Sequence, residues 1–308
     1  MRIVLTRLLA LLLLATLLSL TSPVFLRSQN LINVVRQASP MIIMAVGMTA
    51  VVLTAGIDLS AGAVLTLSSA LAALALKSDL PVMLGPLVGL AVGFLCGLGN
   101  GLMVSAIGLP PFIATYGTMW VGQGLSLVLI QGNVIHDFHP AFRFLGAGTL
   151  GGIPMPIVLM AGTVAVSCFV LRYFAWGHHV HAVGGNREAA RAAGVPVRKT
   201  VTLAYGASGL LAAFAGLIYI ARLNAAEQGT GDPLLLPTIA AVCIGGTSLF
   251  GGRGSIVGTV LGGLIMALLL NALNLWGVPS LWQSFVVGSM ILIAVLVDTW
   301  FGSRRTKR

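Results

Sequence analysis

The chain has 308 residues, of which 57% are hydrophobic and 8% are charged, and its mean hydropathy is +1.02. A soluble domain carries roughly 25% charged residues, and a water-soluble fold of this size could not cover so much apolar surface. The formal net charge of +10 is concentrated at the N-terminal tip, in one loop and in the C-terminal tail, without the interleaved aromatic residues that favour nucleic-acid binding. We therefore expect an all-α, polytopic transmembrane helical bundle that contacts the lipid bilayer and no nucleic acid.

Apolar runs of about 20 residues, the length that crosses a bilayer as a helix, follow one another along the chain. We expect about ten spans, within a range of nine to eleven, and one membrane domain that covers residues 1–308. No small-residue cleavage site follows the first run, so it is expected to be a retained helix. The spans are expected near 4–25, 40–56, 60–77, 82–106, 112–131, 155–174, 201–221, 234–250, 256–274 and 281–301.

The distribution of lysine and arginine predicts the orientation of these spans. With the N-terminus inside, twelve of the basic residues fall in inside segments and five in outside segments. Because cytoplasmic loops of membrane proteins carry an excess of basic residues, we expect both termini to lie inside. The loop at 132–154 is then outside, and the loop at 175–200 is inside.

An acidic residue follows the second span. Asp58 lies in the sequence Gly-Ile-Asp-Leu-Ser-Ala-Gly, between two apolar runs. A carboxylate buried in a bilayer is costly, which makes this residue a candidate for function. It belongs either to an irregular segment that forms a gate or pathway element, or to a cytoplasmic turn in which it caps the following helix. The polar candidates for a translocation pathway or gate are Asp58, Ser60, Thr115, Asn271 and Asn274.

Five glycines of the fourth span recur at every fourth position, on nearly one face of a helix. They are Gly85, Gly89, Gly93, Gly97 and Gly101, here called the glycine stripe. In lipid, small residues let a second helix approach closely and gain dispersion contacts. The stripe predicts helix packing, either inside one subunit, which is the more general use of such a pattern, or at a subunit interface or pore wall.

Motifs of catalysis and nucleotide binding are absent from the sequence. No lysine follows a glycine, which excludes the Gly-x-x-x-x-Gly-Lys phosphate loop, and neither His-Glu-x-x-His nor Gly-x-Ser-x-Gly occurs. We expect no catalytic residue, no metal site and no cofactor in this chain. His136, Asp137 and His139 have the spacing of metal ligands, but a solvated loop is the better interpretation because no further histidine or cysteine lies near.

The loop at 175–200 contains the signals of a short helix. Asn186 is a suitable N-cap, Glu188 lies in the first turn, and Gly194 followed by Pro196 ends the segment. A helix of about two turns is not stable on its own. It is therefore either a compact knob that packs on a partner or an exposed linker between two spans.

Four motifs occur in order along most of the chain. Segments 56–62, 111–119, 185–196 and 231–259 carry Gly-Ile-Asp-Leu-Ser-Ala-Gly, Pro-Phe-Ile-Ala-Thr-Tyr-Gly-Thr-Met, Gly-Asn-Arg-Glu-Ala-Ala with Gly-Val-Pro, and a glycine-rich block. Together they resemble the permease subunits of bacterial sugar ATP-binding-cassette (ABC) transporters of the ribose type. The chain departs from that pattern near position 178. An arginine-like residue is expected there, and this chain has His178, His179 and His181 instead.

The resemblance implies a multi-pass subunit of the bacterial inner membrane that moves a monosaccharide, such as a ribose-like sugar or a polyol, by alternating access. It implies a second permease subunit, identical or different, cytoplasmic ABC ATPase subunits that bind ATP and Mg²⁺, and a periplasmic sugar-binding protein. The cytoplasmic loop at 175–200 would couple this chain to the ATPase. The coupling residues implied are Gly185, Asn186, Arg187, Glu188, Ala189, Ala190 and Gly194.

Three other functions are compatible with a polytopic chain. One is an ABC permease for another small polar ligand, such as branched-chain amino acids. A second is an ion-coupled secondary transporter, which would need ion sites near mid-membrane, and the small number of carboxylates within the spans disfavours it. A third is a membrane scaffold without transport, which would leave the four ordered motifs unexplained.

Overall fold

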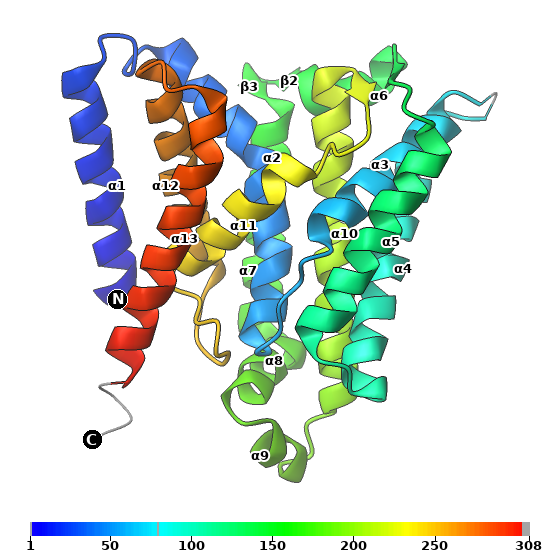
Figure 1. The fold of residues 1–308 in the computed structure, drawn as a ribbon, viewed down its shortest axis with the longest axis vertical. Coiled ribbons are helices and arrows are strands. Elements are labelled where there is room, and N and C mark those ends of the chain that lie inside the picture. The colour runs from blue at the N-terminus through cyan, green and yellow to red at the C-terminus, as the bar shows by residue number, and fades with distance from the viewer. Residues whose placement is uncertain (1, 79, 304–308) are drawn as a thin grey trace.

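The computed structural model describes residues 2–78 and 80–303, and most of them are helical (Figure 1). The helices that correspond to the expected spans are α1 (Arg2–Thr21), α2 (Ser28–Leu53), α3 (Ala61–Leu76), α4 (Leu84–Leu102), α5 (Pro111–Ile130), α7 (Met155–Tyr173), α10 (Val197–Leu223), α11 (Asp232–Ile244), α12 (Ile256–Leu275) and α13 (Ser280–Ser303). A short π-helix, η1 (Met103–Ile107), continues α4.

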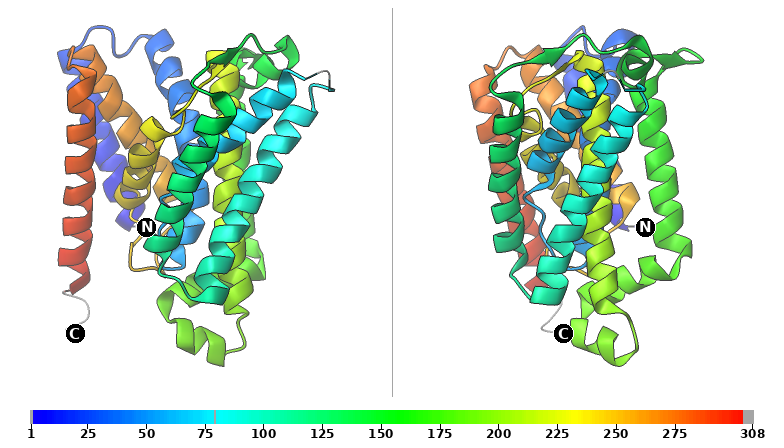
Figure 2. Two further views of the ribbon diagram at one scale, coloured as in Figure 1. Left: turned by 45° about the vertical axis from the view of Figure 1, so that its right-hand side comes forward. Right: turned by 90° about the vertical axis from the view of Figure 1, so that its right-hand side faces the viewer.

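Shorter elements lie at the two opposite ends of the bundle (Figure 1). α8 (Ala175–Gly185) and α9 (Arg187–Ala192) lie at one end, and α13 points toward this end in both views of Figure 2. α6 (Pro140–Ala147) lies at the other end, together with two antiparallel strand pairs. β1 pairs with β4 and β2 pairs with β3, and their bounds are β1 (Ile135–His136), β2 (Thr149–Leu150), β3 (Ile153–Pro154) and β4 (Ala225–Ala226).

Six helices of the described chain are long and apolar enough to cross a membrane. They are α2, α4 continued by η1, α5, α7, α10 and α12. Four further apolar stretches are shorter, namely Leu5–Thr21, Ala61–Leu76, Asp232–Ile244 and Ser280–Ile293. The expectation of a helical membrane bundle is therefore confirmed, and six of the ten expected spans meet the crossing length by themselves.

Two expected spans differ from the observed helices in their bounds. α2 begins at Ser28, well before the expected span at 40–56, because the helix runs through Pro40 instead of starting there. A proline inside a helix removes one backbone hydrogen bond, and here the helix continues. α11 ends at Ile244, short of the expected residue 250, because two glycines follow and Gly246 has a φ of +86°, a conformation that favours glycine.

α11 is short for a membrane span. Its 13 residues rise about 20 Å, against a hydrocarbon core about 30 Å thick. Figure 1 shows it running obliquely beside α2. A helix that stops inside the bilayer needs its free backbone groups to face protein or water. The backbone N–H of Gly245 is bonded to Ala241 O and that of Thr247 to Val242 O, so the chain satisfies these groups within its own turn.

α2 and α10 form the centre of the bundle. Every residue of α2 from Ala38 to Leu53 is buried, and α10 packs against α2, α3 and α4. A helix that is apolar on all sides is stable only when other helices surround it. In α7, by contrast, the buried residues are Pro156 and Met160, so this helix lies at the periphery.

The glycine stripe of α4 lies against α3 and α10 of the same chain. A Cβ atom built on Gly89 would lie 3.2 Å from the Cβ of Ala72, and one built on Gly93 or Gly97 would overlap backbone oxygens of α10. α4 therefore approaches α10 so closely that only glycine fits at these positions. Of the two uses considered from the sequence, this contact is the one inside a single subunit.

Candidate functional site

The α2–α3 loop buries a carboxylate between two helices. Asp58 is 1% exposed, so it does not lie in an open turn. Its Oδ1 accepts hydrogen bonds from the backbone N–H of Ser60 at 3.0 Å and from the Ser60 hydroxyl at 2.6 Å. Because Ser60 is the N-cap of α3, the carboxylate stabilises the start of that helix while being enclosed by protein. Asp58 therefore lies in a buried irregular segment and also contacts the start of α3.

The hydrogen bonds around Asp58 extend to three more helices. The Ser208 hydroxyl of α10 donates to Asp58 Oδ2 at 2.8 Å, and Asn100 Nδ2 of α4 donates to the Ser60 hydroxyl at 2.7 Å. Thr118 of α5 donates to Asn100 Oδ1 at 2.6 Å. These five residues are here called the Asp58 network. It joins the α2–α3 loop to α4, α5 and α10 through satisfied polar groups inside an apolar bundle.

The backbone next to Asp58 is held in the same way. The Ile57 carbonyl oxygen accepts hydrogen bonds from Tyr205 at 3.2 Å and from Thr115 at 3.3 Å. Gly56 has no space for a side chain, because a Cβ atom there would lie 2.6 Å from the Tyr205 hydroxyl oxygen. The predicted residues Asp58, Ser60 and Thr115 are therefore brought together at one irregular segment.

The other two pathway candidates lie elsewhere. Asn271 and Asn274 of α12 line a cavity of about 630 Å³ between α2, α10, α11, α12 and α13, here called the amide cavity. Asn271 and Asn30 each donate an amide hydrogen bond to the other, at 3.1 and 3.3 Å, and Gln283 donates to Asn274 at 2.9 Å. The cavity is lined by the C-terminal end of α10, so it lies toward the end of the bundle opposite α9.

Charged groups also line the amide cavity. Arg222 of α10 stacks over Tyr219, with 5.0 Å between its guanidinium carbon and the ring centroid. Its Nη1 is buried and has no hydrogen-bond partner among the residues that the structure describes. Asp232, in the first turn of α11, also lines the cavity, and its Oδ1 accepts a hydrogen bond from Gln123 at 3.3 Å. A donor and an acceptor of opposite charge thus lie in the walls of one cavity.

The loop at 175–200 forms two helices, of which the sequence predicted the second. Asn186 caps α9 as expected, since its Oδ1 accepts hydrogen bonds from Glu188 N at 3.0 Å and Ala189 N at 2.9 Å. Gly194, with a φ of +80°, follows the helix. Arg187, Glu188 and Ala189 are exposed, whereas Ala190 is buried in a cluster with Val183 and Val197. α9 therefore packs one side on its own subunit and leaves the other side uncovered.

A glycine junction connects this segment to α2. A Cβ atom on Gly184 would overlap the carbonyl oxygen of Leu53, the last residue of α2. The N–H of Gly252 donates to the same Leu53 oxygen at 2.9 Å, and a Cβ on Gly251 would lie 2.7 Å from that of Ala55. The end of α8, the end of α2 and the α11–α12 loop thus meet through backbone atoms, directly before the Asp58 segment. His181 joins the same junction, with its Nδ1 3.3 Å from Gly252 O.

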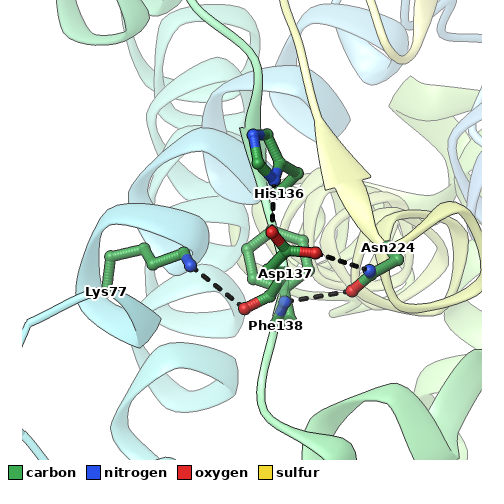
Figure 3. A network of polar contacts seen from close by, with 5 residues as sticks. All are labelled: Lys77, His136, Asp137, Phe138 and Asn224. Carbon is green, nitrogen blue, oxygen red and sulfur yellow. Dashed lines mark hydrogen bonds and ion pairs between the residues drawn. The ribbon is translucent and has the colours of Figure 1, made fainter.

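At the opposite end, a polar cluster holds the loop between α5 and α6 (Figure 3). Lys77 donates to the Asp137 carbonyl oxygen at 3.0 Å, and Asn224 Oδ1 accepts from Phe138 N at 3.0 Å. His136 Nδ1 lies 2.7 Å from Asp137 Oδ2, and this hydrogen bond lowers the pKa of the exposed Asp137 carboxyl. The cluster ties the loop to the ends of α3 and α10, which gives His136 and Asp137 a structural role in a solvated loop.

Comparison with known families identifies the family to which the chain belongs. The profile described as "Branched-chain amino acid transport system / permease component" matches residues 30–295. The chain belongs to this permease family. As a permease, it is a component of an ABC importer and not an enzyme.

Individual relatives of the permease cover nearly its whole length. It is 40% identical to the ribose import permease protein RbsC of Haemophilus influenzae, over 96% of this chain and 93% of that protein. It is 42% identical to RbsC of Bacillus subtilis, over 94% and 91%, and 34% identical to the D-allose transport system permease protein AlsC of Escherichia coli, over 91% and 86%. These matches confirm the resemblance to ribose-type permeases. No solved structure matches the chain at a significant level.

Proposed function

We propose that this permease carries a monosaccharide, a ribose-like sugar or a polyol, across the bacterial inner membrane by alternating access. The observation that supports this most strongly is the identity of 40–42% to ribose import permeases over more than 90% of both chains. The D-allose and fructose permeases, at 34% and 37% identity, make the wider class of monosaccharides the proposed substrate. Branched-chain amino acids are the second candidate, because the matching family profile carries that description.

We infer that all ten apolar helices lie in the membrane with both termini in the cytoplasm. The basic bias of twelve against five supports this, and so does the position of the α8–α9 segment opposite α6 (Figure 1). The four shorter helices would then be tilted, or would end at protein or water within the bilayer. Single cysteines at positions 140 and 187 in a cysteine-free background, probed with impermeant reagents on cells, report this directly. Labelling of both positions from the same side would contradict the proposed orientation.

The proposed partner of α9 is a cytoplasmic ABC ATPase. The uncovered side of α9 supports this role, because exposed small and charged residues on a helix this short gain stability from a partner surface. The coupling set is the one expected from the sequence, Gly185 to Ala190 with Gly194. The glycine junction would carry a movement of α9 to the end of α2 and so to the Asp58 segment, which we propose as the gate.

ATP and Mg²⁺ are proposed to bind to the ATPase partners. A second permease subunit, identical or different, and a periplasmic sugar-binding protein complete the proposed importer. Co-expression and purification test this composition: we expect an ABC ATPase to co-purify in fixed stoichiometry, and the isolated permease to hydrolyse no ATP. Hydrolysis by a pure permease, or ion-driven transport without an ATPase, would instead support an enzyme or a secondary transporter.

A further inference from the structure

We propose that the amide cavity is a monosaccharide-binding site within a single permease subunit. This inference rests on the proposed function and adds a location and a set of contacts. The cavity volume of about 630 Å³ lies in the range of small-molecule sites, roughly 300–1,000 Å³, and leaves room for a monosaccharide with bridging waters. It lies toward the end of the bundle opposite α9, where a substrate arriving from outside would enter.

Amide side chains are concentrated in the cavity. The chain has eight asparagines and six glutamines, and six of these fourteen side chains line this one cavity. They are Asn30, Asn33, Gln37, Asn271, Asn274 and Gln283. An amide both donates and accepts hydrogen bonds, as every sugar hydroxyl does. Asn30 pairs with Asn271 and Asn274 with Gln283, but an amide can make more than one hydrogen bond, so these walls keep donor and acceptor positions for a polar ligand.

Arg222, in the cavity wall, carries a donor without a partner among the described residues. Its buried Nη1 has no partner among the described residues, although a buried N–H without an acceptor is unfavourable. The Arg222 guanidinium interacts with Tyr219 and is repelled by Arg36 of α2, and its Nη1 still has no acceptor among the described residues. Because Arg222 lines the cavity, a sugar hydroxyl or ring oxygen would supply the acceptor once the guanidinium turns toward the cavity.

The charges in the cavity wall favour one class of ligand. Arg222 and Asp232 both line the cavity, so different hydroxyl groups of one ligand can accept from the first and donate to the second, which favours a neutral polyhydroxylated molecule over an anion. A lipid chain would gain little from walls that carry six amides. A zwitterionic amino acid could also pair with Arg222 and Asp232, and the binding measurement separates it from a sugar.

Binding should be measured on the permease–ATPase complex in lipid nanodiscs without the binding protein, with radiolabelled D-ribose, D-allose, D-fructose and L-leucine as probes. We expect saturable binding of at least one sugar, lowered about tenfold by Arg222→Gln and by Asp232→Asn, and partly retained by Arg222→Lys. Arg143→Gln, which changes an exposed arginine of α6, is the matched control and should leave binding unchanged. Each variant's unfolding temperature should equal the wild-type value, which separates lost contacts from lost folding.

Three outcomes would overturn the inference. One is saturable leucine binding with no sugar binding. Another is sugar binding that Arg222→Gln and Asp232→Asn leave unchanged. The third is no binding of any sugar by a complex that, with its binding protein, accumulates D-ribose in vesicles. In that third case the proposed function stands and the cavity is not its site, whereas a lack of both binding and uptake would contradict both proposals.

Discussion

The Ser208 hydroxyl donates a hydrogen bond of 2.8 Å to the carboxylate of Asp58, a residue 150 positions earlier in the chain. This bond joins the central helix α10 to the irregular segment between α2 and α3. The same segment directly follows Leu53, the residue at which α8 packs on the end of α2 in the glycine junction. A change in the position of the α8–α9 segment would therefore act on the Asp58 network from two sides, through α2 and through α10.

The first prediction concerns the stability of the Asp58 network. Asp58→Ala removes the acceptor for Ser60 and Ser208, and each buried donor left without a partner costs about 1–3 kcal/mol. Ser208→Ala removes one bond and should cost about 1 kcal/mol. We expect the double variant to be destabilised by less than the sum of the two, when unfolding is measured in detergent. Strict additivity would show that the two side chains do not interact.

A second prediction separates close helix packing from a general effect of glycine. Gly97→Ala places a Cβ atom onto the Tyr205 carbonyl oxygen and should destabilise the permease by about 1–3 kcal/mol. Gly99→Ala, on the same helix, has nothing within 4 Å of the new atom and should be neutral or slightly stabilising, because alanine favours helix by about 1 kcal/mol. Thermal unfolding of both variants checks this, and equal behaviour of the two would argue against the α4–α10 contact.

The third prediction concerns coupling through α9. Glu188 and Ala189 are exposed, so Glu188→Lys and Ala189→Trp should insert and fold normally. Glu188→Lys reverses a charge in the first turn of the helix, and Ala189→Trp adds a large side chain to its uncovered side. Both changes should interfere with docking of α9 on the ATPase. We expect both variants to lose most sugar uptake and most substrate-stimulated ATP hydrolysis in proteoliposomes, while the binding protein still docks.

Ala190→Trp is the comparison for these two variants. Ala190 is 5% exposed and packs in a cluster with Val183 and Val197, so a large side chain should overpack the subunit itself and lower its unfolding temperature. Near-normal uptake by both Glu188→Lys and Ala189→Trp would leave α9 as a linker between spans.

The fourth prediction tests the glycine junction. Gly184→Ala would overlap the Leu53 carbonyl oxygen, whereas Gly185→Ala, the next residue, meets nothing within 4 Å. We expect Gly184→Ala to reduce the number of substrate molecules moved per ATP hydrolysed, because α8 can no longer follow the end of α2. Gly185→Ala should leave the junction intact, so a change in its ratio reports docking of α9 on the ATPase. A loss of coupling in Gly185→Ala alone would assign the effect to α9 docking and not to the junction.

Hydropathy predicts the positions of the apolar helices well, because the bilayer thickness sets the length of each apolar run. All ten expected spans have a helix, and the cap of α9 at Asn186 follows from local chemistry alone. The errors lie where tertiary packing overrides a local signal. The expected span began at Pro40, whereas α2 continues through this residue because other helices enclose it. α11 ends before the expected residue 250, at the glycines that follow Ile244.

The partners of Asp58 were not predictable from spacing. Asn100 is visible in the sequence as the one amide of the expected span at 82–106, and this signal could have been used. Its partners Ser60 and Thr118 lie on other helices, and only the packing of the bundle brings them within hydrogen-bond distance. The amide cavity was not predictable for the same reason, because its lining comes from five different helices that only the packing of the bundle brings together.

The most direct test of the account is substrate uptake by the complete importer. The permease, its ATPase and its binding protein are reconstituted in proteoliposomes with the binding-protein side outward, and accumulation of D-ribose, D-allose, D-fructose and L-leucine is measured with and without internal ATP. We predict that at least one of the three sugars accumulates only when ATP is present inside, and that leucine does not. Accumulation of leucine alone, or accumulation of a sugar driven by an ion gradient without ATP, would contradict the account.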